Sequence, residues 1–593
     1  MLTLIPVLLA LGSAAFAQRD PGPALFEKNC VVCHKAGSEN RAPLPEVMKS
    51  LTQAAIVTAL ESGTMKAQGA ALTPVERVAL AKFLSGTEPA TAVIGNPCGT
   101  GAPAGGSGAW NGWGVDAANT RFQPPKMAGL SAADVPKLKL KWAFGFPGAA
   151  TAFGQPTIAG GKMYFGSDNG TVYAVNAKSG CVYWTFKAPA TVRSAITLAS
   201  VGGAQHAFFG DIQANVYAVN AADGRLRWRM KVDDHRYARV TGSPKFEGGK
   251  VYVSVSSVEE VSPASAKYEC CTFRGSVAAL EASTGKLDWK SHAIPDPPTA
   301  TKKNPAGTQL YGPAGAAIWM SPTLDLERKM IYVGTGNGYS DPPTKYTDAI
   351  TAYGMDGSMK WVKQMTAGDG WNFACINPNK ANCPEVNGPD VDFGASPILK
   401  RLKNGRRLLI AGQKSGVVHA IDPDRDGEIV WQVRIGKGGA LGGIQWGMAA
   451  DDDNVYVALS DRNPSKHEEE GGMFALKLAT GEKVWHTPAP PPTSCEGRPN
   501  CSAAQMAPVT AIAGVVFSGS MDGTLRAYSA KDGSIVWSFN TIRDFETVNG
   551  VKAKGGSISA SGPVIVDGML YLNSGYGALG GIPGNVLLAF GLE

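Results

Sequence analysis

The feature that most constrains this chain is a short repeat, Ala-x-x-x-x-x-Gly-x-x-x-Trp, which recurs seven times, give or take a residue. Each copy joins an apolar run such as GTVYAV or GTLRAY to a Gly-containing turn and a segment ending in Trp, the pattern of a β-hairpin. Copies about 40 to 70 residues apart leave room for one four-stranded sheet per repeat, which predicts a β-propeller. The copies are Ala174 to Trp184, Ala218 to Trp228, Ala279 to Trp289, Ala352 to Trp361, Ala420 to Trp431, Ala475 to Trp485 and Ala527 to Trp537.

The two ends of the repeat region supply an eighth unit. The segment LKLKWAF around Trp142 has the Trp half of the repeat, and the C-terminal NVLLAFGLE has the Ala half. Pairing these halves in one sheet closes the ring and removes its open edges. The sequence therefore predicts an all-β, eight-bladed propeller.

Composition limits the remaining possibilities. With 593 residues, of which 44% are hydrophobic, the chain is long enough for a large propeller and one small additional domain. The net charge of +7 is modest, and the sequence has no dense run of Lys and Arg, so we expect no nucleic-acid partner.

Residues 1–17 resemble an export signal. They form an apolar stretch that ends in Ala15-Phe16-Ala17, a small-x-small cleavage pattern, although no Lys or Arg precedes it. The alternative is a membrane anchor, but the run is short for a span and contains Pro6. We expect a periplasmic protein with no membrane span after signal removal.

Cysteine usage agrees with an oxidising compartment. Two of the ten cysteines belong to the segment CVVCH, which leaves eight for disulfides. Two pairs are close in sequence within loops, one pair is adjacent and open to a vicinal bridge, and the last two pair only by elimination. In that order they are Cys375 with Cys383, Cys495 with Cys501, Cys270 with Cys271, and Cys98 with Cys181.

The segment CVVCH is the attachment motif of c-type haem. Cys30 and Cys33 would form the thioethers and His34 would supply one axial nitrogen to the iron. The alternative, a zinc or redox pair, lacks a second pair of ligands nearby. Flanking helical patterns, ALFEKN and LTPVERVALAKFL, predict a small all-α cytochrome c domain at residues 18–86.

The second axial ligand should be a thioether. Met65 stands in the loop before the last predicted helix, whereas Met48 lies in an apolar helical stretch and is better explained as core, so we favour Met65. An aperiodic tract rich in Ala, Pro and Gly at residues 87–108 predicts a linker, which places the propeller at residues 109–593.

Residues 109–593 resemble the quinoprotein alcohol dehydrogenases. The chain is most similar to the polyvinyl alcohol dehydrogenases that carry a cytochrome, in the segments GWGVDAANTRFQ, ECCTFRGS, NCPEVNGPDVDFGASP and PGNVLLAF. The resemblance implies pyrroloquinoline quinone (PQQ) and Ca²⁺ on the propeller axis, in addition to haem c in the small domain. A flat quinone with three carboxylates needs an aromatic platform, cations and a metal with oxygen ligands.

The resemblance assigns residues to these tasks. Trp319 matches the indole beneath the quinone, Asn337 the amide ligand of Ca²⁺, and Lys414 the cation over the quinone oxygens. Glu260 matches the carboxylate ligand of Ca²⁺, with the adjacent Glu259 as the alternative register. The candidates for the cofactor carboxylates are Arg193 and Thr241, and Gln445 is expected on the same face.

The general base is where this chain departs from the methanol-type pattern. Those enzymes have Trp-Asp, whereas here Trp371 is followed by Asn372 and a cysteine-containing insert. We place the base at Asp392, with Asp369 and Asp390 as alternatives. The adjacent cysteines also lie in a later repeat than the vicinal pair of methanol-type enzymes, which leaves open whether they reach the cofactor.

The function implied is oxidation of a secondary alcohol, with polyvinyl alcohol the preferred substrate. Asp392 would take the hydroxyl proton while hydride passes to the quinone, and electrons would then pass to the haem and on to a periplasmic acceptor such as a cytochrome. The rivals are a dehydrogenase of small alcohols and a non-enzymatic outer-membrane scaffold propeller, which needs neither haem nor axial calcium ligands.

Overall fold

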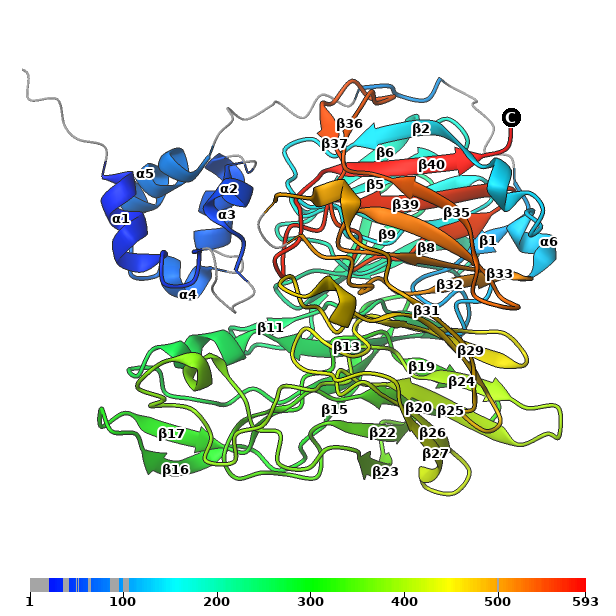
Figure 1. The fold of residues 1–593 in the computed structure, drawn as a ribbon. Coiled ribbons are helices and arrows are strands. Elements are labelled where there is room, and N and C mark those ends of the chain that lie inside the picture. Colours follow the sequence, from blue (N-terminus) through cyan, green and yellow to red (C-terminus); the bar gives the residue numbers. More distant parts are fainter. Residues whose placement is uncertain are drawn as a thin grey trace, which may run out of the picture.

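The computed structural model describes residues 21–35, 42–49, 51, 53–61, 65–85, 95–99, 106–498 and 501–593. The predicted signal, residues 1–17, and much of the predicted linker lie outside these ranges. At the N-terminal end the described helices form a small body beside the propeller (Figure 1). They are α1 (Gly22–Asn29), α2 (Pro45–Met48), α3 (Gln53–Glu61), α4 (Lys66–Gly69) and α5 (Pro74–Leu84).

The rest of the described chain forms the eight four-stranded antiparallel sheets predicted from the repeat. Blade 1 runs from β3 (Thr157–Ala159) to β6 (Val182–Lys187), and blade 2 from β7 (Thr197–Val201) to β10 (Leu226–Lys231). Blade 3 runs from β12 (Lys245–Glu247) to β15 (Leu287–His292). Blade 4 consists of β19 (Thr323–Asp325), β20 (Met330–Gly334), β22 (Ala349–Gly354) and β23 (Met359–Gln364). Blades 5 to 7 are β24 (Ile398–Arg401) to β27 (Glu428–Arg434), β28 (Ala449–Ala450) to β31 (Lys483–Pro488), and β32 (Thr510–Ile512) to β35 (Ile535–Asn540).

The eighth blade closes the ring with strands from both ends of the propeller. Its order is β2 (Lys139–Gly145), β40 (Val586–Gly591), β39 (Met569–Ser574) and β38 (Val564–Val566), so the N-terminal strand completes a C-terminal sheet. Trp142 lies opposite Ala589 in the β2–β40 ladder, which joins the two half-repeats as predicted. The closure leaves neither end of the ring as a free blade edge.

Additional strands decorate this ring. Short strands extend blades 1 and 3, and the connections contain two further hairpins and one two-stranded ladder of non-consecutive strands, β18 with β21. They are β1 (Ala109–Trp110), β11 (Ala238–Arg239), β16 (Thr299–Lys303) with β17 (Gln309–Gly312), β18 (Ala314–Gly315) with β21 (Gly338–Ser340), and β36 (Asp544–Phe545) with β37 (Ala553–Lys554).

The Ala, Gly and Trp of each repeat have one packing role. In each hairpin the Ala lies opposite the Trp across the ladder, as Ala218 does to Trp228. The indole of Trp228 then packs on Gly285 of the next blade, and its Nε1 donates to the carbonyl of Ala282 at 2.8 Å. Small residues on both sides thus allow the Trp to bridge neighbouring blades, and this is why the repeat fixes the fold.

Gly285 provides a test of this packing. Gly285 has φ +74°, and a Cβ there would lie 2.6 Å from the ring of Trp228, whereas Gly249, with φ +79°, has no atom within 4 Å of such a Cβ. We expect Gly285→Ala to lower the free energy of unfolding by about 1 to 3 kcal/mol more than Gly249→Ala, because the backbone strain is shared and only Gly285 is overpacked. Urea unfolding of both variants measures the difference; equal losses would contradict the packing role.

All four disulfides expected from the sequence are present. The Cys98–Cys181 bridge fastens the described part of the linker to blade 1, where Cys98 N also donates to Val182 O at 2.9 Å. Cys30 and Cys33 are not disulfide-bonded. The eight cysteines predicted to form bridges thus do so, and the two cysteines of CVVCH do not.

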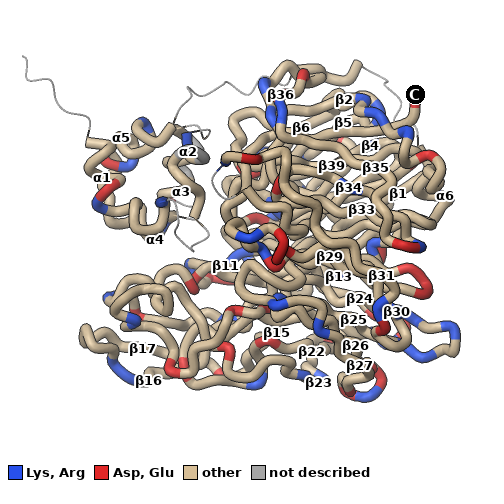
Figure 2. Tube along the Cα trace, in the orientation of Figure 1, with Lys and Arg blue, Asp and Glu red and all other residues tan. Residues whose placement is uncertain are grey.

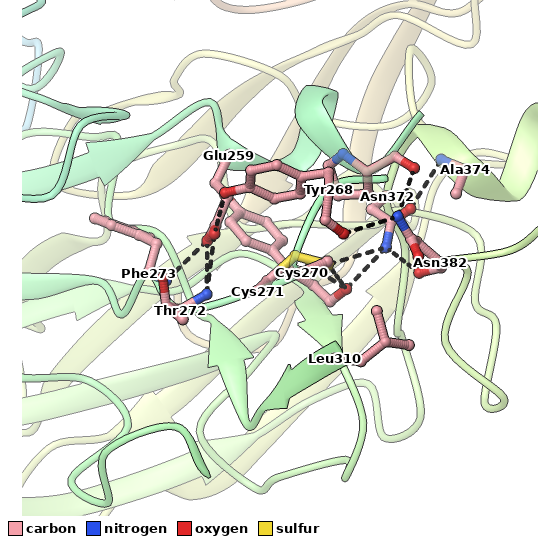
Figure 3. The surroundings of a disulfide bond; sticks show 12 residues. Glu259, Tyr268, Cys270, Cys271, Thr272, Phe273, Leu310, Asn372, Ala374 and Asn382 are labelled. Atoms are coloured by element: carbon pink, nitrogen blue, oxygen red, sulfur yellow. Dashed lines mark hydrogen bonds between the residues drawn. A yellow bond between two sulfur atoms is a disulfide. The ribbon is translucent and has the colours of Figure 1, made fainter. Parts of the chain in front are cut away.

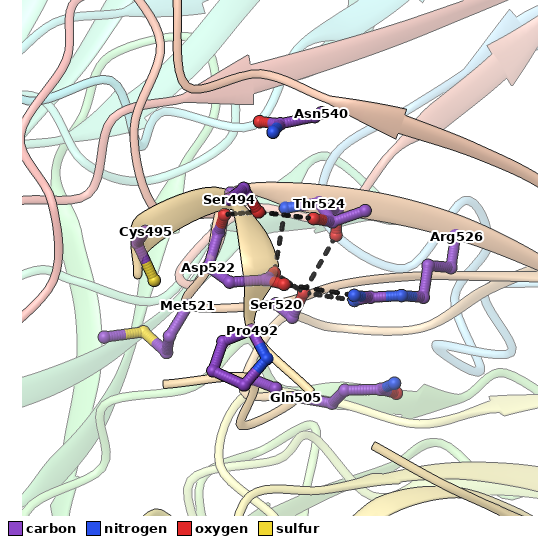
Figure 4. A network of polar contacts seen from close by, with 12 residues as sticks. Pro492, Ser494, Cys495, Gln505, Ser520, Met521, Asp522, Thr524, Arg526 and Asn540 are labelled. Carbon is purple, nitrogen blue, oxygen red and sulfur yellow. Dashed lines mark hydrogen bonds and ion pairs between the residues drawn. The ribbon is translucent and has the colours of Figure 1, made fainter. Parts of the chain in front are cut away.

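The loop closed by Cys495–Cys501 is held against blade 7 by a buried polar network (Figure 4). Ser494 donates to the Asp522 carbonyl at 3.0 Å, and the Asp522 carboxylate accepts from Arg526 Nη2 at 3.0 Å. Arg526 Nη1 also donates to Ser520 Oγ at 2.7 Å. Because the Arg526 charge is paired and hydrogen-bonded to the turn before its strand, it can be buried.

Lys and Arg are interspersed with Asp and Glu over the loops and outer strands (Figure 2). This mixed surface agrees with the modest net charge of +7. Throughout the ranges that the structure describes, no helix combines the length and the apolar character needed to cross a membrane.

Candidate active site

A cavity of about 990 Å³ lies at one end of the propeller and continues into the helical domain. On the propeller side its walls come from two sets of loops, those entering the innermost strand of a blade and those following the second strand. On the helical side it is lined by Cys30, Cys33, His34 and Met65. Both cofactor regions predicted from the sequence therefore face one continuous space.

The entry loops share one rule of position. In five blades the residue four positions before the innermost strand lines the cavity. These residues are Phe153, Arg193, Thr241, Trp319 and Gln445. Four of the five are candidates named from the sequence, and Phe153 is one that the same offset would have found.

Trp319 presents an aromatic surface in the cavity. Its ring meets the Trp446 ring edge-on at 5.0 Å, and Lys414 Nζ lies 5.6 Å from its centre. At Gly394, the equivalent position in the next blade, a Cβ would lie only 2.1 Å from Trp319 Cη2. Gly394 is thus the residue that leaves room for the indole.

Asp392 lines the same cavity and is held by two donors. Its Oδ1 accepts from Asn337 N at 2.8 Å, and its Oδ2 pairs with Lys414 Nζ at 2.7 Å. Lys414 also reaches Asp390 Oδ1 at 3.2 Å. Both contacts of Asp392 stabilise its ionised form, the form that can accept a proton.

The alternative bases lie behind this wall. Asp369 accepts from Asp390 N at 2.9 Å and Val391 N at 2.7 Å, so its carboxylate shapes the loop that carries Asp392. Neither Asp369 nor Asp390 is among the described residues that line the cavity.

A further aspartate, Asp348, is buried close to these residues. Burial, reinforced by the nearby carboxylates of Asp369, Asp392 and Asp390, raises the pKa of Asp348 well above its ordinary value.

Asn337 and Glu260 also face the cavity. The Asn337 amide donates to the carbonyls of Gly338 at 3.0 Å and Trp371 at 2.7 Å, which leaves its oxygen as the atom suited to a metal. Among the described residues no group of three His, Cys, Asp or Glu could bind a metal by itself.

Whereas Glu260 lines the cavity, Glu259 lies in a buried network beside the vicinal disulfide (Figure 3). Its carboxylate accepts from Phe273 N at 2.8 Å, Thr272 N at 2.9 Å and the Tyr268 hydroxyl at 2.7 Å. Burial acts to raise the pKa of Glu259, but donors from His235, Thr272 and Phe273 outweigh burial and hold it below its ordinary value. Glu259 thus anchors the short 3₁₀ turn η2 (Glu259–Ala264) that carries Glu260.

The vicinal disulfide lies one layer behind the cavity wall. Both sulfurs of Cys270 and Cys271 lie within 3.9 Å of the Tyr339 carbonyl, and Tyr339 lines the cavity. Cys270 and Cys271 are not among the described lining residues. In this structure the pair supports the wall rather than forming it.

Substitutions of the neighbouring residues Glu259 and Glu260 are expected to affect different properties of the protein. We expect Glu259→Gln to lower the free energy of unfolding by about 2 to 4 kcal/mol at pH 7, because the new amide donors face existing donors. The ionised carboxylate contributes its stability above the unfolded-state pKa of about 4.3 and loses it as pH falls through the lower folded-state pKa. The deficit of the variant should therefore narrow below about pH 4 in urea unfolding.

Glu260→Gln is the matched control. We expect it to cost less than about 1 kcal/mol of stability, because Glu260 faces the cavity, and to weaken Ca²⁺-dependent retention of PQQ. The assignment would be wrong if Glu260→Gln lost stability but kept normal Ca²⁺ dependence, while Glu259→Gln kept its stability but lost Ca²⁺-dependent retention of PQQ. In that case Glu259 would be the cavity ligand and Glu260 the structural residue.

The remaining sequence candidates have local partners. Thr241 Oγ1 donates to the Trp319 carbonyl at 3.0 Å and so positions the indole. Gln445 Nε2 donates to Gly442 O at 2.5 Å, and the Arg193 guanidinium lies 4.5 Å over the Trp446 ring. Lining residues that the sequence analysis did not assign include Phe153, Arg239, Tyr339, Trp446 and Tyr576.

In the helical domain, His34 is oriented for a metal. Its Nδ1 lies 2.6 Å from the Pro43 carbonyl, which fixes the Nδ1–H tautomer and leaves Nε2 for iron. Burial lowers the pKa of His34, against the opposing effect of the Pro43 hydrogen bond. Met65 and Met48 both line the hollow, Met65 at the start of α4 and Met48 within α2.

Family models match the chain in three regions. Residues 110–434 match the model described as glucose/ethanol/alcohol dehydrogenase, beta-propeller domain. Residues 414–585 match that of outer membrane protein assembly factor BamB, and residues 17–84 match cytochrome C oxidase, cbb3-type, subunit III. The first match covers more than half of the chain and the third covers the helical domain.

A polyvinylalcohol dehydrogenase of Pseudomonas sp is 40% identical over 99% of this chain and 96% of its own length. The chain belongs to the PQQ-dependent alcohol dehydrogenases. A polyvinylalcohol dehydrogenase of Sphingopyxis sp. is 36% identical over 98% of this chain and 94% of its own length. The crystal structure of quinohemoprotein alcohol dehydrogenase from Comamonas testosteroni shares the fold, with a TM-score of 0.58, 19% identity and coverage of 82% of this chain and 80% of that one.

The cofactor set expected from the sequence, PQQ, haem c and Ca²⁺, is that of this family. The residues present fit it. The cavity of the dehydrogenase offers an indole beside Gly394, two lysines, two arginines and the oxygens of Glu260, Asn337 and Asp392. Its other end offers two unbridged cysteines, a histidine and methionines. An enzymatic function thus replaces the scaffold alternative.

Proposed function

We propose that this dehydrogenase oxidises secondary alcohol groups, with polyvinyl alcohol as the principal substrate. The observation that carries the proposal is the position of Asp392 in the cavity wall, joined to Lys414 at 2.7 Å and lying with Trp319 around one space. The substrate class is supported by two full-length relatives named as polyvinylalcohol dehydrogenases.

Each of the site residues has its own role in the proposed reaction. Trp319 supplies a flat surface for the quinone, and Lys414, Asn337 and Glu260 supply the cation and oxygen ligands around it. When bound, the quinone supplies a hydride acceptor and Ca²⁺ a Lewis acid. Asp392 takes the hydroxyl proton of the alcohol, since its donors keep the carboxylate ionised and oriented.

Electrons leave through the helical domain. Cys30 and Cys33 would hold the haem, with His34 Nε2 and Met65 Sδ as axial ligands, at the other end of the same cavity. We propose export through residues 1–17, a cytochrome c domain at 18–86, a linker at 87–108 and a propeller at 109–593. The next acceptor is a periplasmic cytochrome or an equivalent carrier.

A dehydrogenase of small alcohols is the second candidate. It is favoured by the cavity being bounded by the helical domain as well as the propeller, which limits the room for a polymer.

Haem reduction in the purified protein, reconstituted with PQQ and Ca²⁺, tests both candidates. We expect the haem absorbance to change on adding polyvinyl alcohol or 2-propanol, and only when the quinone is present. Reduction by ethanol alone would assign small primary alcohols. Haem that stays oxidised with every alcohol would overturn the dehydrogenase mechanism.

A further inference from the structure

Arg239 is a cavity residue that the sequence analysis did not identify. It ends β11, opposite Ser256 in the ladder with β13 (Lys250–Ser257), just before the chain reaches Glu260. Arg239, Ser256 and Glu260 all line the cavity, as does Arg193 from the preceding entry loop. Two guanidinium groups therefore face one space from adjacent blades.

Each guanidinium has an identified neighbour in the described chain. Arg193 lies against the Trp446 ring at 4.5 Å, and Glu260 is the acidic group whose charge acts on Arg239. Burial, followed by the positive charge of Arg193, lowers the pKa of Arg239 to about 10, and Glu260 opposes the effect. Burial and the charge of Arg193 thus both disfavour the positive charge of Arg239.

An anionic ligand would reverse this balance. Arginine is suited to carboxylates because its planar fork can form two parallel hydrogen bonds, and such bonds strengthen away from water. Lys414 is paired with Asp392 and Asp390, and Lys187, the other lining lysine, donates to the Asn169 carbonyl at 2.6 Å. The two arginines are therefore the cavity cations best placed to bind a carboxylate ligand.

We propose that Arg239 and Arg193 together form a clamp for the carboxylates of PQQ, with Arg239 as a second cationic contact. The inference rests on the proposed cofactor site. A haem propionate has the same chemistry, but the neighbours of Arg239 favour the quinone: Glu260, Arg193 and Thr241 all line the propeller end with Trp319.

The test compares Arg239→Gln with Arg239→Lys and with Arg227→Gln in the full-length, haem-loaded protein. Arg227 is exposed on β10, so its variant controls for loss of one positive charge. PQQ binding is measured in the presence of Ca²⁺ by quenching of tryptophan fluorescence and by equilibrium dialysis. The haem midpoint potential is measured on the same samples.

We expect Arg239→Gln to raise the Kd for PQQ by about 10- to 100-fold, Arg239→Lys to raise it less, and Arg227→Gln to leave it within about twofold. The trimethyl ester of PQQ should bind wild type more weakly than the free acid, and Arg239→Gln should reduce that preference. If Arg239→Gln does not fold, the affinities of wild type and Arg239→Lys for PQQ and for its trimethyl ester still test the clamp.

Three results separate the outcomes. An unchanged Kd for PQQ in Arg239→Gln, with an unchanged haem potential, overturns the clamp. An unchanged Kd with a shifted haem potential overturns it in favour of a propionate partner. Failure of wild type to bind PQQ contradicts the proposed cofactor site itself, and not the assignment of Arg239 alone.

Discussion

Replacing Asp392 with Asn is expected to lower the turnover of alcohols by about 100- to 10,000-fold, the range typical for loss of a general base. The amide keeps the size of the side chain but cannot take a proton from the substrate. Its oxygen can still accept from Asn337 N, although the ion pair with Lys414 is lost, so urea unfolding of the variant is measured beside its kinetics. Steady-state kinetics with a dye acceptor should show the loss in kcat, while the affinity for PQQ changes little.

Asp390→Asn and Asp369→Asn are the control variants that show whether Asp392, and not a neighbouring aspartate, is the general base. Asp390 holds Lys414 from behind the wall, so its amide should reduce turnover by about tenfold or less. Asp369 accepts two backbone N–H groups, so its amide should lower the stability of the loop before it lowers turnover. A larger kcat loss in either variant than in Asp392→Asn would move the base to that residue.

The propeller could be predicted in detail because each repeat contains the Ala, Gly and Trp residues that pack neighbouring blades together. Trp228 needs a small Ala opposite it in its own hairpin and a Gly at positive φ in the next blade, and the repeat contains both. Closure through Trp142 and Ala589 followed from the same rule, since each end of the propeller carries half of it. The sequence cannot set how the helical domain sits beside the ring, because the linker carries no such periodic pattern.

Site residues on the entry loops were accessible to sequence reasoning for a geometric reason. A side chain four residues before an innermost strand lies near the axis in several blades, as Arg193, Thr241 and Trp319 do. Phe153 obeys the same offset and would have been found by applying it to blade 1.

Arg239 and Glu259 could not be assigned in this way. Arg239 belongs to the short strand β11, which lies outside the four strands of the repeat, and its role depends on how β11 pairs with β13. Glu259 and Glu260 are adjacent, so only the direction of a 3₁₀ turn decides which carboxylate enters the cavity. Neither property has a periodic signature in the sequence.

Removing the haem attachment should separate the two halves of the reaction. In a Cys30→Ala, Cys33→Ala double variant, alcohol-dependent reduction of a cytochrome acceptor is expected to fall by at least about 100-fold, because no haem is held at the end of the cavity. Turnover with a dye that accepts electrons from the quinone should change by less than about twofold, because the propeller residues are untouched. Parallel assays with the two acceptors on one preparation measure both quantities.

A Cys495→Ser, Cys501→Ser double variant is the matched control, since it also removes two cysteines but from a disulfide loop on the propeller. It should keep both the haem and cytochrome reduction. Equal loss of dye turnover and cytochrome reduction in the Cys30, Cys33 variant would mean that the helical domain supports the quinone site itself. Retention of cytochrome reduction without haem would show that electrons leave the propeller by another route, and the shared cavity would then have no part in electron transfer.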